Sequence, residues 1–88
     1  MPKVSVIVPI YNVEQYVREC ITSLTCQTLQ DIEIICVDDC GTDKSMEIVE
    51  QLAKTDERIK VIHNKQNSGL SESRNNGMKH ATAPYIMF

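Results

Sequence analysis

Hydrophobic residues along this chain alternate between short β-type runs and longer stretches with the spacing of an amphipathic helix. Runs rich in Val and Ile, with few interior polar residues, are typical of strands buried in a parallel sheet. The pattern predicts strands at 3–9, 32–37, 60–63 and 85–88, and helices at 13–26, 44–54 and 70–81. With right-handed crossovers this order, β-α-β-α-β-α-β, gives an α/β fold with a Rossmann-like parallel sheet.

Individual residues predict where these elements end and which faces they bury. Pro9 should end the first strand, because proline cannot continue the hydrogen-bond ladder. Asp43 is a good N-cap for the second helix. Gly77 inside the third helix costs up to about 1 kcal/mol relative to alanine, so a close packing contact is expected there. The apolar spacing also predicts core positions for Tyr16, Cys20, Cys26, Cys36, Leu70, Met78 and Ala81.

The last predicted strand runs to Phe88. Four apolar residues with nothing after them to cover the sheet edge are unusual at the end of a finished domain. We therefore expect residues 1–88 to be the incomplete N-terminal part of a larger domain, truncated after the fourth strand.

Composition narrows the classes of function. The 88 residues form at most one small domain, and the net charge of −3 gives no general attraction for nucleic acid. The residues contain no recognisable signal peptide or membrane span. The cysteines, at 20, 26, 36 and 40, lack the spacing of a zinc ribbon. We expect a reducing, cytoplasmic location, or one at the inner face of the membrane.

Polar residues follow the predicted strands, at 9–14, 38–43 and 67–75. In parallel sheets, ligands bind beyond the carboxyl ends of the strands, so the first two of these loops should share one ligand.

Two kinds of side chain in these loops suggest which ligand it is. Asp38 and Asp39 could accept hydrogen bonds from a ribose or a nucleobase. The N3–H of uracil is the favoured donor, but the exocyclic amine of cytosine or the donors of guanine would also suit a carboxylate. Arg74 offers a planar fork for phosphate oxygens. On spacing alone, it is an equally good interpretation that the two acids bond turn amides and Arg74 pairs with a surface Glu.

Four segments of the chain carry a more specific pattern. They are V-S-V-I-V-P-I-Y-N-V-E (4–14), V-D-D-C-G-T-D (37–43), N-S-G-L-S-E-S-R-N-N-G (67–77) and A-P-Y-I-M-F (83–88). In order and spacing they resemble the family 2 glycosyltransferases of the GT-A fold. The family shows P-x-Y-N-x-E after a strand, then V-D-D-G-S-T-D, then N-x-G-x-x-x-A-R-N-x-G, then a strand leading into D-x-D. Cys40-Gly41 replaces the usual Gly-Ser, and Ser73 replaces an alanine, which leaves the match intact.

The resemblance implies sugar transfer from a nucleoside-diphosphate sugar, with UDP the expected nucleotide, to an acceptor hydroxyl with inversion at the anomeric carbon. The acceptor would be a glycan or a lipid-linked sugar in polysaccharide synthesis. By motif position, Pro9 and Tyr11 line the nucleoside pocket and Glu14 contacts the base or ribose. Asp39 binds the base, and Asp38 supports the turn. By the same matching, Arg74 lies near the diphosphate.

The resemblance also implies parts that lie beyond Phe88. In this family D-x-D holds Mg²⁺ or Mn²⁺ on the diphosphate, and the catalytic base comes later still. Residues 1–88 alone are therefore expected to be inactive, since the charge of the leaving group would not be neutralised. Two other interpretations stay open: a non-catalytic nucleotide-sugar-binding module, and a phospho-accepting receiver-type signalling domain. In the latter, however, the acid pair normally follows the first strand.

Overall fold

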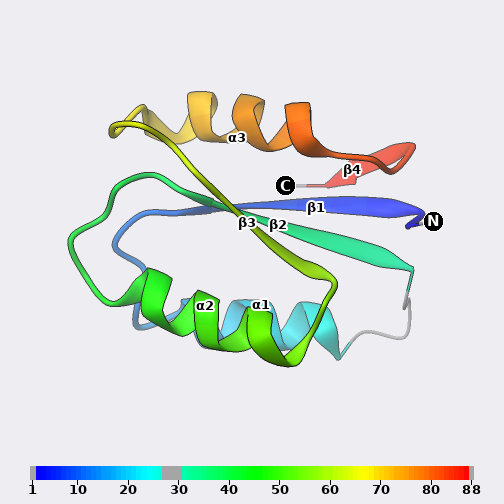
Figure 1. Ribbon diagram of the computed structural model, residues 1–88, viewed down its shortest axis with the longest axis horizontal. Coiled ribbons are helices and arrows are strands. Elements are labelled where there is room, and N and C mark those ends of the chain that lie inside the picture. The colour runs from blue at the N-terminus through cyan, green and yellow to red at the C-terminus, as the bar shows by residue number, and fades with distance from the viewer. Residues whose placement is uncertain (1, 27–30, 88) are drawn as a thin grey trace.

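The computed structural model describes residues 2–26 and 31–87. In chain order the elements are β1 (Val4–Ile10), α1 (Val17–Thr25), β2 (Ile32–Asp38), α2 (Ser45–Thr55), β3 (Ile59–His63), α3 (Gly69–His80) and β4 (Tyr85–Met87). The strands form a four-stranded parallel sheet in the order β3-β2-β1-β4 (Figure 1). The predicted Rossmann-like α/β fold is confirmed. In the described part of the chain, every helix is too short or too polar to cross a membrane.

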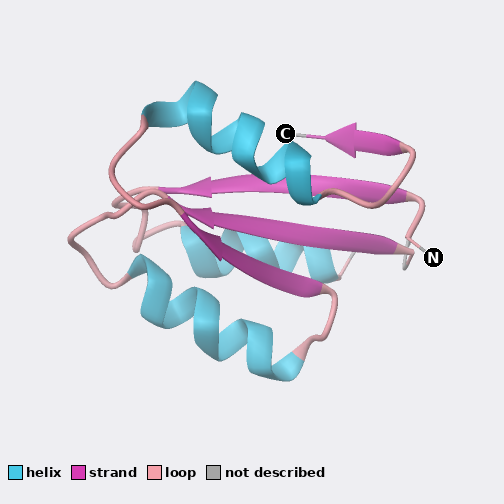
Figure 2. Ribbon diagram, turned by 45° about the horizontal axis from the view of Figure 1, so that its top comes forward, coloured by secondary structure: helices cyan, strands magenta, loops and turns pink. Residues whose placement is uncertain are grey.

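Helices cover both faces of the sheet, with α1 and α2 on one face and α3 on the other (Figure 2). Because successive side chains of a strand point to opposite faces, β1, β2 and β3 each supply both cores, whereas the residues of β4 are exposed. The smaller core, under α3, contains Ile7, Ile35 and Val37. The larger core, against α1 and α2, contains Ile10, Val17, Ile21, Ile32, Ile34, Cys36, Val49 and Ile59. Burial on both faces explains the nearly continuous apolar run of β2.

Helix α3 approaches the sheet more closely than a side chain at Gly77 would permit. A Cβ atom there would lie 2.5 Å from Cγ2 of Ile7 and 3.2 Å from Cγ2 of Val37. The close contact predicted at Gly77 is therefore confirmed.

Gly77→Ala should destabilise the protein by about 1–3 kcal/mol, because overpacking against the buried Ile7 outweighs the better helix propensity of alanine. Urea unfolding measures the effect. Asn75→Ala, on the exposed side of the same helix, is the matched control and should leave stability unchanged or slightly raised. A Gly77→Ala protein as stable as the wild type would show that α3 can move away from the sheet at little cost.

Strand β1 continues through Pro9 to Ile10, so the prediction that Pro9 ends it was wrong. Pro9 pairs in register with Val37 of β2. On the other side, β4 pairs only with residues 4–6 of β1. Among the described residues, no strand lies beside Pro9 on the β4 side of β1, so that side is locally a sheet edge. The missing N–H of proline therefore costs no hydrogen bond between strands, and proline is tolerated at sheet edges.

Several predicted core positions are exposed instead. Tyr16 is 66% exposed, because α1 begins at Val17 and not at 13, so its buried face carries Val17 and Ile21. Cys20 and Cys26 are exposed for the same reason, whereas Cys36 is buried as predicted. Leu70 and Met78 are 56% and 43% exposed.

The inner face of α3 consists of small residues, four apart in the sequence. Ser73 and Gly77 are its buried residues, and Ala81 packs partly against the core beneath, as predicted. This spacing is one stripe of a helix, and small side chains along it let the backbone approach the sheet. The larger apolar residues of α3 therefore point elsewhere.

Candidate functional site

The loop after β1, the end of β2 and the start of α3 meet at the carboxyl end of the sheet. A cleft of about 370 Å³ opens there, lined by Pro9, Tyr11, Val13, Asp39, Asn67, Gly69, Leu70 and Ser73. The register between β1 and β2, which runs to Ile10↔Asp38, brings the two strand ends level. The cleft thus brings together three residues singled out in the sequence: Pro9, Tyr11 and Asp39.

The carboxylate of Asp39 is fixed by hydrogen bonds to the start of α3 and to the loop before it. Its Oδ1 accepts bonds from the backbone N–H of Ser68 at 2.7 Å and from Nδ2 of Asn64 at 2.8 Å. Its Oδ2 accepts a bond from the N–H of Gly69 at 3.0 Å. Backbone amides at a helix start lack partners within the helix, and the dipole there favours negative charge. Asp39, only 4% exposed, therefore caps α3 while it lines the cleft.

These bonds also keep Asp39 charged. Burial alone would raise the pKa of Asp39, but hydrogen bonds from Ser68, Asn64, Gly69 and Ser73 lower the pKa below its usual value. An ionised carboxylate has about four acceptor positions. The hydroxyl hydrogen of Ser73 can rotate to another acceptor, which leaves one position open to a donor on a ligand. The site can therefore recognise an N–H or O–H group.

Asp38 has different surroundings, because adjacent residues at the end of a strand face opposite sides of the sheet. Its Oδ1 accepts a bond from the N–H of Cys40 at 3.0 Å, and its Oδ2 lies 2.8 Å from Nδ1 of His63. Cys40 has a φ of 61°, typical of a tight turn. Asp38 lines a separate cavity of about 140 Å³. Its contacts hold the turn after β2 and the end of β3.

Glu14 and Arg74 are exposed, and neither lines the 370 Å³ cleft. The backbone N–H of Glu14 donates a hydrogen bond to Oδ2 of Asp43 at 2.9 Å. Arg74 follows Ser73 on α3, and only Ser73 faces the sheet. The structure therefore does not bring Glu14, Asp38 or Arg74 into the cleft, and their roles toward a nucleotide stay predictions.

Hydrogen bonds connect the loop after β1 to the loop after β2. Oδ1 of Asn12, a residue with a φ of 53°, accepts bonds from the N–H groups of Thr42 and Asp43 at 2.8 and 3.3 Å. Asp43 precedes Lys44, the N-cap residue of α2, so its predicted position was wrong by one residue. Its Oδ1 still accepts a bond from the N–H of Ser45, at 3.0 Å. This network fixes the wall of the cleft that carries Tyr11.

The partners of Asp39 could not be read from the sequence. Asn64 and Ser68 lie 25 and 29 residues further along the chain. From the sequence, the amides at the start of this helix, at 69–71, are expected to assist Arg74 in binding phosphate, but the N–H of Gly69 donates to Asp39 instead. Within residues 2–26 and 31–87, no three His, Cys, Asp or Glu side chains gather where they could hold a metal ion.

Comparison with known proteins assigns the family. Residues 5–88 match the model for glycosyl transferase family 2. The chain belongs to glycosyl transferase family 2. This membership agrees with the sequence motifs and weighs against the receiver-type alternative.

A curated relative and a solved structure match along all or nearly all of the chain. The uncharacterized glycosyltransferase EpsJ of Bacillus subtilis (strain 168) is 57% identical over 88 residues, which are 100% of this chain and 25% of EpsJ. S. aureus TarS 1-349, whose crystal structure was solved in complex with UDP-GlcNAc, is 38% identical in sequence to this chain. The two structures superimpose with a TM-score of 0.90 over 98% of this chain and 25% of the TarS chain.

A solved structure with lower sequence identity has the same fold. The mannosyltransferase PcManGT of Pyrobaculum calidifontis, in complex with GDP-Man and Mn²⁺, is 27% identical. It superimposes with a TM-score of 0.84 over 92% of this chain and 25% of its own. The chain thus spans about a quarter of the length of each of these three proteins.

Proposed function

We propose that this chain is the N-terminal, nucleotide-binding half of the transferase domain of an inverting glycosyltransferase, which transfers a sugar from a nucleoside-diphosphate sugar to an acceptor hydroxyl. The observation that carries the proposal is the cleft at the ends of β1 and β2, where Tyr11 and the ionised Asp39 lie together. An aromatic face beside a fixed acceptor suits a nucleobase with a ring N–H. TarS, which is similar over nearly the whole chain, was solved with UDP-GlcNAc.

Uridine diphosphate is the nucleotide that these groups favour. The N3–H of uracil can donate to the open acceptor position of Asp39. Cytosine has a lone pair at that atom, which a carboxylate repels, so cytosine could donate only through its exocyclic amine. Guanine could also donate a ring N–H to Asp39, so the choice of uracil over guanine rests on the similarity to TarS. The similarity to TarS, solved with UDP-GlcNAc, is also greater than that to PcManGT, solved with GDP-Man.

The other predicted residues receive supporting roles. Asp38 would hold the turn that presents Asp39, while Glu14 and Arg74 would reach the ribose and the diphosphate from outside the cleft. A Mg²⁺ or Mn²⁺ ion would neutralise the leaving diphosphate. From the order of the family's motifs, the D-x-D that would hold this ion and the catalytic base are expected beyond Phe88.

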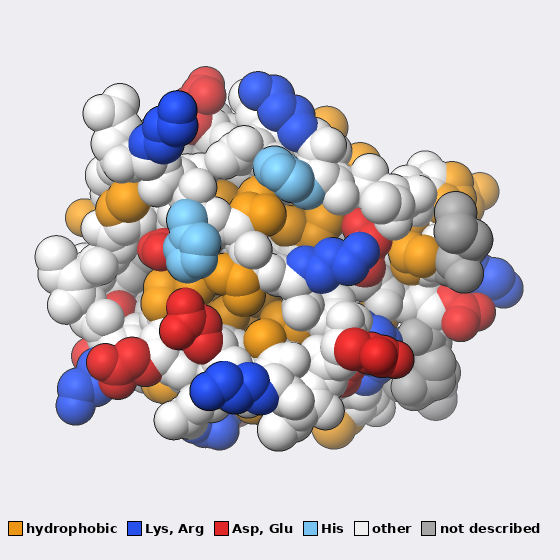
Figure 3. Space-filling model, viewed as in Figure 1, with side chains coloured by type: hydrophobic (Ala, Val, Ile, Leu, Met, Phe, Trp, Pro, Cys, Tyr) orange, Lys and Arg blue, Asp and Glu red, His pale blue; other side chains and the backbone are white. Residues whose placement is uncertain are grey.

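The proposed acceptor is a glycan or a lipid-linked sugar, and the proposed place of action is the cytoplasm or the inner face of the membrane. No contact with nucleic acid is proposed. The charge distribution supports this, since Lys and Arg side chains alternate with Asp and Glu on the face shown in Figure 3. A basic patch, by contrast, is typical of nucleic-acid binding.

Incubation of the full-length protein with Mn²⁺ and a panel of UDP-, GDP- and CDP-sugars tests the proposal, with release of the nucleoside diphosphate as the readout. We expect release from a UDP-sugar in the presence of a suitable acceptor, and measurable UDP binding without one. Absence of UDP binding at millimolar concentration would refute the proposal.

Tyr11→Ala should weaken UDP binding by about 10-fold, the worth of one base–aromatic contact of roughly 1–2 kcal/mol. Tyr16→Ala is the matched control, because Tyr16 is similarly exposed but lies outside the cleft. Its affinity for UDP should equal that of the wild type. Equal losses in both variants would mean that Tyr11 does not face the base.

A further inference from the structure

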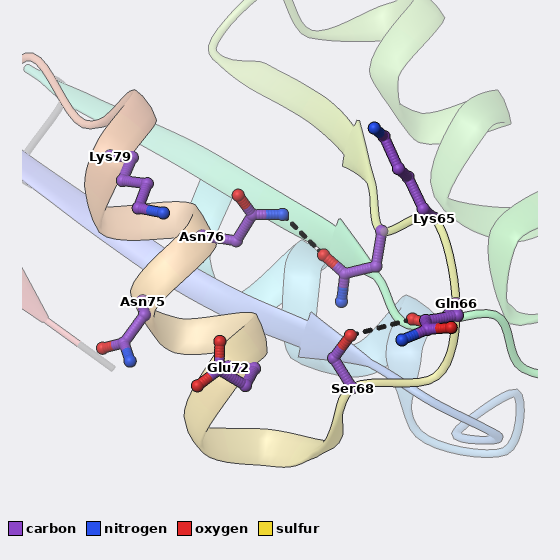
Figure 4. A pocket seen from close by; sticks show the side chains of 8 residues that line it. Lys65, Gln66, Ser68, Glu72, Asn75, Asn76 and Lys79 are labelled. Carbon is purple, nitrogen blue, oxygen red and sulfur yellow. Dashed lines mark hydrogen bonds between the residues drawn. The ribbon is translucent and has the colours of Figure 1, made fainter.

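The side chain of Asn64 connects Asp39 to helix α3. Its Nδ2 donates hydrogen bonds to Oδ1 of Asp39 at 2.8 Å and to Oγ of Ser73 at 3.0 Å. Its Oδ1 accepts a bond from Nδ2 of Asn76 at 2.6 Å, which Figure 4 shows crossing from the helix. A carboxylate only accepts, so the amide nitrogen must face Asp39. Both donor hydrogens and the oxygen of the Asn64 amide are therefore in use.

The backbone of Asn64 is anchored as well. Its N–H donates to the carbonyl of Asp38 at 2.9 Å, and its carbonyl accepts a bond from Sγ of Cys40 at 3.3 Å. Asp38 is the last residue of β2 and Cys40 lies in the turn after it, so the two partners flank Asp39. Asn64 is thus fixed to β2 through its backbone and to α3 through its side chain.

We propose that Asn64 is a positioning residue for base recognition: it fixes the rotation of the Asp39 carboxylate so that the open acceptor position faces the base. This inference rests on the proposed function of Asp39. The terminal torsion of an aspartate is broad and prefers no single orientation. Oδ2 of Asp39 accepts a bond from one backbone group, the N–H of Gly69, whereas Oδ1 accepts bonds from both Ser68 and Asn64. The two donors on Oδ1 therefore decide how the plane of the carboxylate is rotated. Without Asn64, we expect weaker discrimination between uracil and cytosine.

A second pocket, of about 440 Å³, lies on the other side of Asn64 and is lined by polar side chains that include Gln66 and Asn76 (Figure 4). Water from this pocket can hydrate Asp39 when the side chain is shortened. Asn64→Ala should therefore have a moderate effect. Asn64→Asp is the sharper test, because it keeps the shape, removes both donors and places a second carboxylate beside Asp39.

The affinities of the full-length protein for UDP and CDP, measured by calorimetry near neutral pH, test the proposal. Asn64→Asp should weaken UDP binding by about 30-fold and CDP binding by no more than about 3-fold, because only UDP uses the oriented acceptor. Gln66→Glu is the matched control. It adds the same charge in the same pocket, and no hydrogen bond in the described structure involves its side chain. It should change both affinities by less than about 2-fold.

The pH dependence separates positioning from general damage. Two close carboxyl groups share a proton readily, and a shared proton would replace the donor lost in Asn64→Asp. The UDP affinity of this variant relative to the wild type should therefore rise as the pH falls from about 8 to 5, whereas that of Gln66→Glu, whose added carboxyl group is not bonded to Asp39, should stay constant. Other titratable groups near Asn64 are present in the wild type and in all variants, so their effect on UDP affinity cancels when the ratio of affinities is taken. These groups are Asp38, Cys40, His63, Lys65, Glu72 and Lys79.

The outcomes distinguish this inference from the proposed function. Absence of UDP binding by the wild type overturns the proposed function. UDP preference that is lost in Asp39→Asn but kept in Asn64→Asp overturns the inference alone. Should Asn64→Asp not fold, Asn64→Ala decides: the inference predicts a UDP-to-CDP preference reduced by about 5-fold, and an unchanged preference overturns it.

Discussion

Asp39→Asn should weaken UDP binding by at least about 100-fold, or roughly 3 kcal/mol. An asparagine has one acceptor oxygen, for which the amides of Ser68 and Gly69 compete. The side-chain oxygen of the Asp39→Asn variant would therefore accept the hydrogen bonds from the start of α3. Its NH₂ group, a donor, would then face the N3–H of uracil, which is also a donor. Two donors that face each other in a closed site repel. The loss of negative charge adds to this effect, because bonds to charged groups are the stronger ones.

Calorimetry with the full-length protein measures the loss, and thermal unfolding shows whether the variant is folded. Asp31→Asn is the control, since Asp31 is exposed and precedes β2 at the opposite end of the sheet. Its UDP affinity should stay within about 2-fold of the wild type. A folded Asp39→Asn protein with nearly normal UDP affinity would mean that Asp39 only caps α3.

Glu33→Ala should destabilise the protein by about 3–5 kcal/mol, because it removes a buried carboxylate and leaves its donors without a partner. Glu33 lies in β2 and is 2% exposed. Its Oε1 accepts bonds from Oγ of Ser5 and the N–H of Thr82, both at 2.9 Å. Its Oε2 accepts bonds from Oγ1 of Thr82 at 2.6 Å and from Nζ of Lys60 at 3.2 Å. One side chain thus joins β1, β2 and β3 to the segment between α3 and β4.

The same carboxylate makes stability depend on pH. Burial alone would raise the pKa of Glu33, but hydrogen bonds from Thr82, Ser5 and Lys60 lower the pKa from 4.5 to about 2. Since the pKa is lower in the folded state, the stabilisation is complete above about pH 4.5 and is lost as the pH falls toward 2. A pKa difference of this size corresponds to about 3 kcal/mol.

Urea unfolding at a series of pH values between about 6 and 2 measures this contribution. In Glu33→Ala the decline of stability across this range should be smaller by about 3 kcal/mol. Glu50→Ala, on an exposed position of α2, is the control and should decline like the wild type. A Glu33→Ala protein with the stability and pH dependence of the wild type would contradict the hydrogen-bond network described here.

The fold was predictable because its periodicities are strong. The buried run of β2 has no competing interpretation as a surface strand, and the β-branched composition of β1 and β3 supports it. The errors arose where packing overrides pattern. Tyr16 has helical spacing with Val13, yet a turn delays α1 until Val17. Helix α3 packs on the sheet through the small residues Ser73 and Gly77, and Leu70 is exposed. A prediction based on the spacing of apolar residues cannot detect a buried helix face made of small residues.

The candidate site was predictable only in part. Its place at the strand ends followed from the topology, and the acids Asp38 and Asp39 followed from their position. The opposite orientations of Asp38 and Asp39 could be predicted, because adjacent side chains of a strand point to opposite faces. The hydrogen bonds that fix the two carboxylates could not be predicted. Asn64 reaches Asp39 across 25 residues of sequence, so only the folded chain reveals the contact. The role of Glu33 could not be predicted for the same reason, because its partners lie on β1, on β3 and in the segment between α3 and β4.

The structure of the full-length protein with bound UDP tests the central claim most directly. We predict that the uracil ring lies against Tyr11, with its N3 atom about 3 Å from the carboxylate of Asp39. A base bound instead in the polar pocket beside Gln66 and Asn76, or anywhere away from Asp39, would contradict it.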